Sequence, residues 1–588
     1  MRYQISLISA CAALLSSQAS AIGAPAGTPY NPYKVKMLGA DQSLMINNIG
    51  KRSKVKRLKT VSHKFIDRKR KRNAPKPSYS FRSPGLSKAK PDAEGKLSIV
   101  VRFKQDYSIP FFPAGASQRR TIASRLDKKV RSSKSRIKGL AVLRKHGFDL
   151  DESFWIANAV AGKIPYGRLG ALLKVAPYAG ITYIQEENTS YIAPQDGNAN
   201  NDVARVRAGM STDPYRGFSY DGGNASGRIS LFDSGIQASH DLLSGRISVN
   251  ADCVEGGSSC LGAGRRLGDV EPSGHGTSSA SIMVGTNALG NRFRGVTNSQ
   301  INSYIIYNDP NPSATNPKCR TRACGNTTAA LRAFQEGMKT SSKVLVAEMQ
   351  WGGTEADSVA IAADNAFDAG FVVIGANGNN GPNAGTVNNP GRAHKALGVG
   401  AIYLRNPPSQ YANQSRGPAT DGRFKPDIQA YSLSETGRKG ANDRLGTFSG
   451  TSGSTPYAGA AADRMAAWLN GYGIVNPAFT YAFLLNSGEN FNFISNNERT
   501  TEGVGLIRLP TDGSATCARL TIKNKQSKSI PINVPSGAST LRAAVWWPES
   551  LNQTHNDLDI RLINPSGQVV AGAFSISSVW EATAVNNP

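Results

Sequence analysis

The sequence predicts an α/β protein whose largest domain has a mostly parallel sheet with flanking helices. From residue 200 onward, short apolar stretches alternate with helix-like ones, as in "GRISLFDSG", "TAALRAFQEGMKTSSKVLVAEM" and "SVAIAADNAFDAGFVVIGANGN". Nearly continuous apolar strands that alternate with helices are typical of a parallel sheet buried on both faces. We therefore expect one α/β domain at residues 200–509.

Beyond about residue 510 the helix-like stretches end. The segments "LRAAVWWPES", "NDLDIRLINPSGQVVAG" and "FSISSVWEATAV" combine strand-forming residues with Gly and Pro turns. Short strands of this kind predict a β-sandwich, complete or incomplete, at residues 512–588.

A small α+β unit is expected before the main domain, at residues 96–193. "KLSIVVRFKQ", "SFWIANAVAGKIP" and "GITYIQEE" predict strands because β-branched and other apolar residues cluster in them. Between them, "RTIASRLDKKVRSSKSRIKGLAVLRKHGF" and "YGRLGALLKVAP" are helix-like. A unit of about 100 residues is large enough to form a domain of its own.

The first 95 residues predict export followed by a linker. Arg2, the apolar "ISLISACAALL" and the small residues that end at Ala21 have the order of a signal peptide, at residues 1–21. Residues 22–95 hold Pro, Gly and basic clusters, which predict a basic disordered linker. No internal run approaches the ~18 apolar residues of a membrane span. We expect a secreted protein, which is extracellular, periplasmic or attached to the cell surface.

The net charge of +28 is concentrated in the first third of the chain. Residues 1–200 carry 36 Lys and Arg against 12 Asp and Glu, whereas residues 201–588 carry 33 against 29. The basic segment 51–72 lacks the interleaved aromatic residues that base stacking needs. We interpret it as a solvated segment and expect no nucleic acid on the mature form. A polyanion-binding arm is the alternative.

Export permits disulfides, and five cysteines follow the predicted signal peptide. The short spacings predict local bridges Cys253–Cys260 and Cys319–Cys324, although spacing alone does not fix connectivity. Cys517 has no predicted partner.

Four polar residues stand at element boundaries of the α/β region. Asp233 ends an apolar strand, His275 lies between two glycines before a small-residue helix, and Asn379 follows the strand "FVVIGAN". In "LGTFSGTSGSTPYAGAAADRMAAWL", Ser452 comes just before a predicted helix with Pro456 in its first turn. Active residues collect at the carboxyl ends of parallel strands, so we expect the four to meet.

Each of these residue types has a place in acyl transfer. A serine hydroxyl is a weak nucleophile until a base takes its proton, and imidazole is that base near neutral pH. A buried carboxylate orients the imidazole. A side-chain amide and a backbone N–H can hold the oxyanion. The order Asp, His, Ser is one that triads are known to use.

The segments "ISLFDSGI", "GHGTSSASIMVG", "VVIGANGNNGP" and "GTFSGTSGSTPYAGAAA" resemble those of the subtilisin-like serine peptidases. The resemblance implies a subtilisin-like fold, a triad of Asp233, His275 and Ser452, and Asn379 as oxyanion donor. It implies substrate-binding roles for Gly352 and Gly353 in "EMQWGG" and for Asn388 in "TVNNPG".

The resemblance extends to the flanking units. Residues 96–193 resemble the family's propeptide, an intramolecular inhibitor and folding chaperone, and the tail resembles a C-terminal sandwich of some members. The implied protein is a secreted serine endopeptidase, made as a zymogen, that hydrolyses protein or peptide substrates. No cofactor is identified, and calcium is left open.

The chain departs from the family pattern at four positions. Gly453 stands where Met is usual, Tyr457 replaces His, Gln350 replaces a small hydroxyl residue, and Ser234 replaces Thr. None removes a catalytic group, but Gln350 and Tyr457 put inherited specificity in doubt.

Three other classes of protein are alternatives to a serine peptidase of this family. An α/β-hydrolase would need Gly-x-Ser-x-Gly with its acid and base after the serine. Here Ser454 occupies the last Gly position and only His555 follows, so this class is excluded. A catalytically inactive binding protein on the same scaffold and a polyanion-binding protein stay open.

Overall fold

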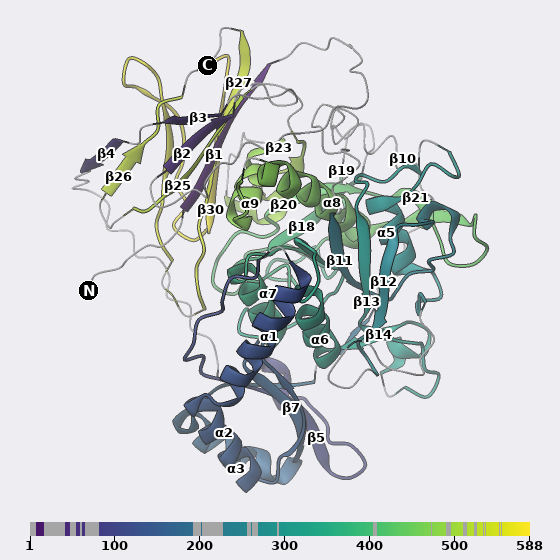
Figure 1. Cartoon of the computed structure of the whole chain (residues 1–588). Coiled ribbons are helices and arrows are strands. Elements are labelled where there is room, and N and C mark those ends of the chain that lie inside the picture. Colours follow the sequence, from purple (N-terminus) through teal and green to yellow (C-terminus); the bar gives the residue numbers. More distant parts are fainter. Residues whose placement is uncertain are drawn as a thin grey trace.

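The structure is a computed structural model of the whole chain (Figure 1). It describes residues 8–16, 42–46, 55–58, 61–64, 81–187, 189–191, 201–202 and 227–588, with gaps at 114, 256–259, 261–267, 291–292, 315, 404–408, 472, 490–495, 510–513, 523–525, 533, 535–536, 552 and 554. Most of the predicted linker, including the basic cluster at 65–72, and most of the chain from residue 192 to 226 lie outside the described residues. Within the described part, none of the helices has the length and hydropathy to span a bilayer.

A large, mostly parallel sheet forms the centre of the molecule, as the sequence predicts. In spatial order its strands are β12 (Ile247–Asp252), β13 (Gln300–Ile305), β11 (Arg228–Asp233), β16 (Val344–Ala347), β17 (Val372–Ala376), β18 (Leu397–Tyr403), β20 (Ile428–Ser432), β24 (Leu506–Ile507) and β23 (Gly488–Glu489), with β19 (Ser409–Gln410) beside β18. Neighbours from β12 to β24 pair in parallel, and only β19 and β23 run antiparallel.

Helices cover both faces of this sheet. One face packs against α5 (His275–Val284), α8 (Gly450–Gly471) and α9 (Pro477–Asn486), and the other packs against α6 (Thr327–Met338) and α7 (Ser358–Asp368). Successive residues of β16 show why its apolar run is continuous. Val344 and Val346 belong to the first core, whereas Leu345 and Ala347 belong to the second. Alternate side chains point to opposite faces, so both sets are buried.

The unit before this domain is a four-stranded antiparallel sheet with helices on it. Its strands, in order, are β6 (Asp149–Phe154), β7 (Ala159–Pro165), β5 (Lys96–Phe103) and β8 (Ile181–Glu186). The basic stretch predicted as one helix forms two, α1 (Ala116–Arg131) and α2 (Lys134–Lys145), because Ser132 and Ser133 interrupt it. A third helix is α3 (Tyr166–Val175). The apolar turn at 154–157 joins the core under α6 and α7, which docks the unit on the main domain.

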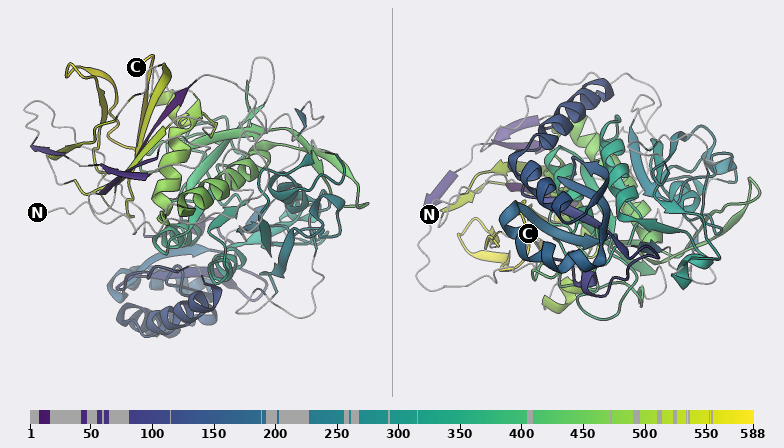
Figure 2. Two further views of the ribbon diagram at one scale, coloured as in Figure 1. Left: turned by 45° about the horizontal axis from the view of Figure 1, so that its top comes forward. Right: turned by 90° about the horizontal axis from the view of Figure 1, so that it is seen from below.

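The C-terminal region is β-rich, as expected. A six-stranded sheet has the order β3 (Val55–Leu58), β2 (Gln42–Ile46), β25 (Ser514–Leu520), β1 (Ile8–Ser16), β27 (Ala538–Trp546) and β30 (Trp580–Asn586). Two small pairs accompany it, β26 (Gln526–Ser529) with β4 (Val61–Lys64), and β28 (Ile560–Ile563) with β29 (Val569–Ala573). Figures 1 and 2 show this region and the α+β unit on different sides of the central domain.

Four N-terminal strands differ from the sequence prediction. β1 lies between β25 and β27, and β2, β3 and β4 lie in a segment expected to be a disordered linker (purple among yellow in Figure 1). The C-terminal strands offer unpaired backbone groups at their edges, which short extended segments can satisfy. Removal of residues 1–21 as a signal peptide stays a prediction.

The remaining short elements lie around the main domain. One small sheet contains β10 (Asn201–Asp202), β21 (Ser434–Gly437) and β22 (Leu445–Phe448), and another contains β14 (Tyr307–Asn308), β15 (Cys324–Asn326) and β9 (Thr189–Tyr191); a last helix is α10 (Asn496–Glu502).

Both predicted disulfides are present. Cys253 bonds Cys260, and Cys319 bonds Cys324, so each closes a short loop. Cys517 is buried in β25, where its register partner on β1 is Cys11.

Polar contacts tie the C-terminal region to the main domain. The indole Nε1 of Trp580 donates to Asp427 Oδ1 at 3.0 Å, and Lys425 Nζ lies 2.5 Å from Asp427 Oδ2. The side chains of Lys425 and Asp427 are both 1% exposed. Burial lowers the pKa of Lys425, and the charge of Asp427 opposes that shift. Losing either charge would leave the other uncompensated in the interior.

We predict that Lys425→Met lowers the free energy of unfolding by about 3 kcal/mol or more, because it leaves the Asp427 carboxylate buried without its cation. Lys163→Met is the matched control, since Lys163 pairs with Asp92 and the two side chains are 41% and 35% exposed. Partly exposed pairs contribute about 0–1 kcal/mol. Urea unfolding followed by tryptophan fluorescence compares the two. Equal losses would contradict the prediction.

Candidate active site

The four predicted residues lie at the carboxyl edge of the central sheet. Asp233 ends β11, His275 begins α5, Asn379 follows β17, and Ser452 is in the first turn of α8. β11 and β17 flank β16 in parallel, so their carboxyl ends face the same way. This is the edge where open parallel sheets bind their ligands.

A buried hydrogen bond joins the histidine to the aspartate. His275 Nδ1 lies 2.8 Å from Asp233 Oδ1, which also accepts the backbone N–H of Ser234 at 2.6 Å. Burial lowers the pKa of His275, but the charge and hydrogen bond of Asp233 outweigh it, with smaller contributions from Glu271 and Asp269. The net pKa is above the ordinary histidine value. The geometry holds the ring with Nε2 available on its other side.

A second buried carboxylate braces the two elements that carry this pair. Asp269 Oδ1 accepts the hydroxyl of Ser234 at 2.8 Å, and Oδ2 accepts the N–H and hydroxyl of Thr277 at 2.8 and 2.6 Å. Ser234 Oγ in turn accepts the N–H of Gly276 at 3.0 Å. Asp269 therefore links the end of β11 to the first turn of α5. Burial raises its pKa to about 7, and the charge of Asp233 adds to that shift.

Ser452 lies inside a helix that the sequence predicts to begin just after it. Helix α8 begins at Gly450, so Ser452 lies inside its first turn and Pro456 lies inside the helix. Proline at 456 has no N–H to donate to the carbonyl of Ser452, four residues earlier. Ser452 is buried, with 4% of its surface exposed. The ring of Phe448 lies edge-on to His275, with centroids 5.0 Å apart.

Asn379 is held by three hydrogen bonds. Its Oδ1 accepts the N–H of Thr451 at 3.0 Å and the hydroxyl of Thr451 at 2.9 Å, and its own backbone N–H donates to Gln350 Oε1 at 2.9 Å. Because Oδ1 is occupied, the amide presents Nδ2 as its donor. This donor and the positive end of α8 can both stabilise a developing oxyanion.

An extended segment, β9, pairs with the central strand β15 of a small sheet beside the site. β9 pairs with β15 antiparallel, with Ser190 opposite Gly325, and Ser190 Oγ donates to the carbonyl of Gln350 at 3.0 Å. β9 belongs to the chain that leaves the α+β unit after β8. The edge formed by β15 and residues 350–353 thus already holds a peptide.

The three predicted substrate-binding residues have different surroundings. Gly352 is exposed with open space around it, whereas Gly353 has a φ of 109° and packs against Asp357. Asn388 is buried, and its amide bonds Asn380 and Ser415. Its side chain is thus engaged within the protein, and its role in substrate binding stays a prediction.

Tyr457 replaces an expected histidine and is fully buried, with its hydroxyl 3.0 Å from Ser434 Oγ. In the described part of the chain, no group of three or more His, Cys, Asp or Glu side chains is arranged to hold a metal ion.

The central domain is similar to known proteins. Residues 226–499 match the model of the Subtilase family. Serine protease AprX of Bacillus subtilis is 32% identical over 126 residues, which cover 18% of this chain and 28% of AprX. Minor extracellular protease Vpr of the same organism is 24% identical over 331 residues, 54% of this chain and 37% of Vpr. The matches thus span about a third of these relatives' length.

Among solved structures, fervidolysin from Fervidobacterium pennivorans, described as a keratinolytic enzyme related to subtilisin, superposes with a TM-score of 0.50 and 15% identity. The alignment covers 88% of this chain and 80% of fervidolysin, which shows a shared fold. The match to the Subtilase family covers residues 226–499, which hold most of the mostly parallel sheet and its flanking helices.

Sequence reasoning missed three residues that hold the site together. Thr451 precedes the predicted nucleophile, Asp269 lies six residues before His275, and Gln350 appeared only as a departure from the family. The run of small hydroxyl residues around Ser452 was a signal for Thr451. Asp269 and Gln350 act through contacts between distant segments, which no local motif displays.

We predict that His275 titrates above about 6.5, the ordinary histidine value. Glu271→Gln removes a negative charge that favours the imidazolium, so the pKa of His275 should fall. NMR of protein carrying ¹⁵N-histidine measures this, since the chain has only 6 histidines and His275→Ala assigns the signal. Glu336→Gln is the control, because Glu336 does not act on His275. A rise in the pKa on Glu271→Gln would contradict the electrostatic account.

Proposed function

We propose that this protein is a secreted serine endopeptidase, made as a zymogen. The single observation that carries the proposal is the buried 2.8 Å contact between His275 Nδ1 and Asp233 Oδ1, at the sheet edge where Ser452 and Asn379 also lie. A neutral imidazole held by a carboxylate is the base that activates a serine hydroxyl.

The proposed reaction begins with Ser452. His275 Nε2 takes the proton of Ser452 Oγ as the oxygen attacks the carbonyl carbon of the scissile peptide bond. Asp233 stabilises the resulting imidazolium and keeps Nε2 directed at the serine. His275 then gives that proton to the leaving amine, and the C–N bond breaks to leave an ester on Ser452. Water, activated by the same histidine, hydrolyses the ester.

The oxyanion is stabilised by groups that are already in place. Asn379 Nδ2 is free to donate because Thr451 occupies Oδ1. The backbone N–H groups in the first turn of α8 lie beside Ser452, and the helix dipole adds a partial positive charge. Donors fixed before the reaction cost no reorganisation in the transition state.

We propose that residues 96–193 are the inhibitory propeptide. Two side chains at the end of β8, Gln185 within the strand and Glu187 just after it, bind the starts of helices on the main domain. Glu187 Oε1 accepts the N–H of Thr328 in α6 at 3.0 Å, and Gln185 Oε1 accepts the N–H of Ser358 in α7 at 2.8 Å. The first N–H groups of a helix have no partners within it, so these contacts satisfy them.

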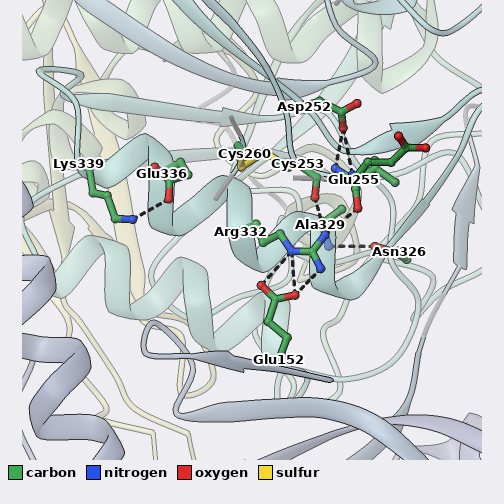
Figure 3. Close-up of a disulfide and its surroundings, with 11 residues drawn as sticks. Glu152, Asp252, Cys253, Glu255, Cys260, Asn326, Ala329, Arg332, Glu336 and Lys339 are labelled. Carbon is green, nitrogen blue, oxygen red and sulfur yellow. Dashed lines mark hydrogen bonds and ion pairs between the residues drawn. A yellow bond between two sulfur atoms is a disulfide. The ribbon is translucent and has the colours of Figure 1, made fainter. Parts of the chain in front are cut away.

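An ion pair adds to this interface (Figure 3). The guanidinium of Arg332 on α6 contacts the carboxylate of Glu152 on β6 and, through Nη1, donates to the carbonyls of Cys253 and Val254 at 2.8 Å each. Arg332 thus joins the unit at 96–193 to the first disulfide of the main domain. Such contacts suit a unit that holds the domain together during folding.

The placement of β9 supports intramolecular inhibition. β9 follows β8 directly and pairs with β15 at the edge of the site, so the chain occupies the path of a substrate. A covalently attached segment competes at high effective concentration, which keeps the site closed until the chain is cut. The proposed cut falls near "YIQEENTSYIAP".

Export is supported by the signal-like N-terminus, by the two disulfides, and by the relative Vpr, which is described as extracellular. The proposed substrates are proteins or peptides. Removal of the first 200 residues would discard the basic segment, so we propose that the mature enzyme binds no nucleic acid.

We predict that Ser452→Ala abolishes peptide hydrolysis without unfolding the protein. His275→Ala should cost a similar factor, on the order of 10⁶ in kcat, because triad members act as a unit. Asn379→Ala should lower kcat by about 10²–10³, because one oxyanion donor is lost. Steady-state kinetics on a fluorogenic peptide measure these changes. Near-normal activity of Ser452→Ala would contradict the assignment of Ser452 as the nucleophile. If Asn379→Ala changed KM alone, Asn379 would not be an oxyanion donor.

We also predict that Ser452→Ala accumulates uncut precursor, since an intramolecular cut needs the enzyme's own nucleophile. The precursor should bind heparin more strongly than the mature form, and added salt should weaken this binding. N-terminal sequencing of the active protein shows whether the basic segment has been removed. A start before about residue 90 would keep the basic segment on active enzyme and favour the polyanion-binding alternative.

A further inference from the structure

Gln350 forms a hydrogen bond with Asn379, the side-chain donor of the proposed oxyanion site. It follows β16, whereas Asn379 follows the neighbouring strand β17. Gln350 Oε1 accepts the backbone N–H of Asn379 at 2.9 Å. The bond therefore connects two strand ends at the carboxyl edge of the sheet.

Asn379 stands on a turn that needs such support. Gly378 before it has a φ of 108°, and a side chain at this position would collide with Asn388 and Ser415. Ser415 holds the far side of the turn, since its N–H donates to the carbonyl of Gly378 at 2.8 Å and its Oγ accepts the N–H of Asn380 at 2.9 Å. Gln350 supplies the bond to the N–H between them.

The same residue touches the peptide at the site. The backbone carbonyl of Gln350 accepts the hydroxyl of Ser190 at 3.0 Å, and Ser190 lies on β9. Trp351, the next residue, exchanges backbone hydrogen bonds with Asn389 at 3.1 and 2.7 Å, which fixes the course of this segment. Gln350 thus has its carbonyl toward the bound chain and its side chain toward Asn379.

We propose that Gln350 is a positioning residue for catalysis, which orients Asn379 so that Nδ2 faces the oxyanion. The proposal rests on the function proposed above. The Gln350 amide acts through its Oε1 on the Asn379 backbone, while Thr451 acts on the Asn379 side chain. With both bonds in place the amide has one orientation, and without the first the turn can rotate about Gly378.

The consequence is specific to the transition state. The oxyanion forms only as the serine attacks, so a misplaced Asn379 lowers kcat and leaves KM nearly unchanged. A role for Gln350 in binding a substrate side chain would instead change KM, and by different factors for different peptides.

The test compares Gln350→Met, Asn379→Ala and the double variant on one fluorogenic peptide. Methionine has a similar length but lacks the amide acceptor. We expect Gln350→Met to lower kcat about tenfold with KM within about twofold, a partial loss of the 10²–10³ that one donor supplies. In the Asn379→Ala background the same change should cost nothing further, because no side chain is left to orient.

Two additional variants distinguish loss of the Gln350 hydrogen bond from a general loss of stability. Gln350→Asn keeps an amide that is one methylene shorter, and should behave like Gln350→Met because it cannot reach Asn379. Gln410→Met is the matched control, since the Gln410 amide bonds the carbonyl of Thr501 away from the site. Its kcat should equal that of the unmodified enzyme.

Additive losses in the double variant, a rise in KM with unchanged kcat, or no effect in either Gln350 variant would overturn the proposal while leaving the peptidase in place. If the unmodified protein cleaves no peptide and Ser452 is inert to a fluorophosphonate, the proposed function itself fails and takes the role of Gln350 with it.

Discussion

Burial of the central parallel sheet on both faces is the constraint on which the site depends. Helices cover both faces of the sheet, so apolar side chains are favoured on these faces. Polar residues that follow the parallel strands therefore gather at the carboxyl edge. Asp233 and Asn379 come from the ends of β11 and β17, on either side of β16. Helices α5 and α8 pack on the same face and bring His275 and Ser452 to that edge. The packing of the core thus determines where the four candidate residues lie.

The same edge fits the proposal that residues 96–193 are an inhibitor carried by the chain itself. The N–H groups at the starts of α6 and α7 need acceptors, and Glu187 and Gln185 supply them from the unit at 96–193. The chain that follows then runs along β15. Docking of the unit therefore places β9 beside β15, at the edge where we propose that substrate binds. A cut just beyond β9 would separate the strongly basic first third of the chain from a nearly neutral remainder.

Much of the fold and the four candidate residues could be predicted because their signals are local. Apolar runs marked the strands, and Asp233, His275, Asn379 and Ser452 each stand beside a strand or helix boundary. The missed features depend on distant contacts. The pairing of β1 with β25 and β27 joins segments some 500 residues apart, and the acceptor for the Asn379 N–H comes from another strand. Helix α8 begins at Gly450, whereas the sequence predicts a later start because a proline such as Pro456 is typical of a first helical turn.

The most direct test of the central claim is to treat the protein with a fluorophosphonate and locate the adduct by mass spectrometry. A serine becomes reactive to such a probe only when a base activates it and an oxyanion site receives the product. The account predicts a single adduct on Ser452, absent from His275→Ala and reduced in Asn379→Ala. An adduct on another residue, or none on a folded and processed protein, would contradict it.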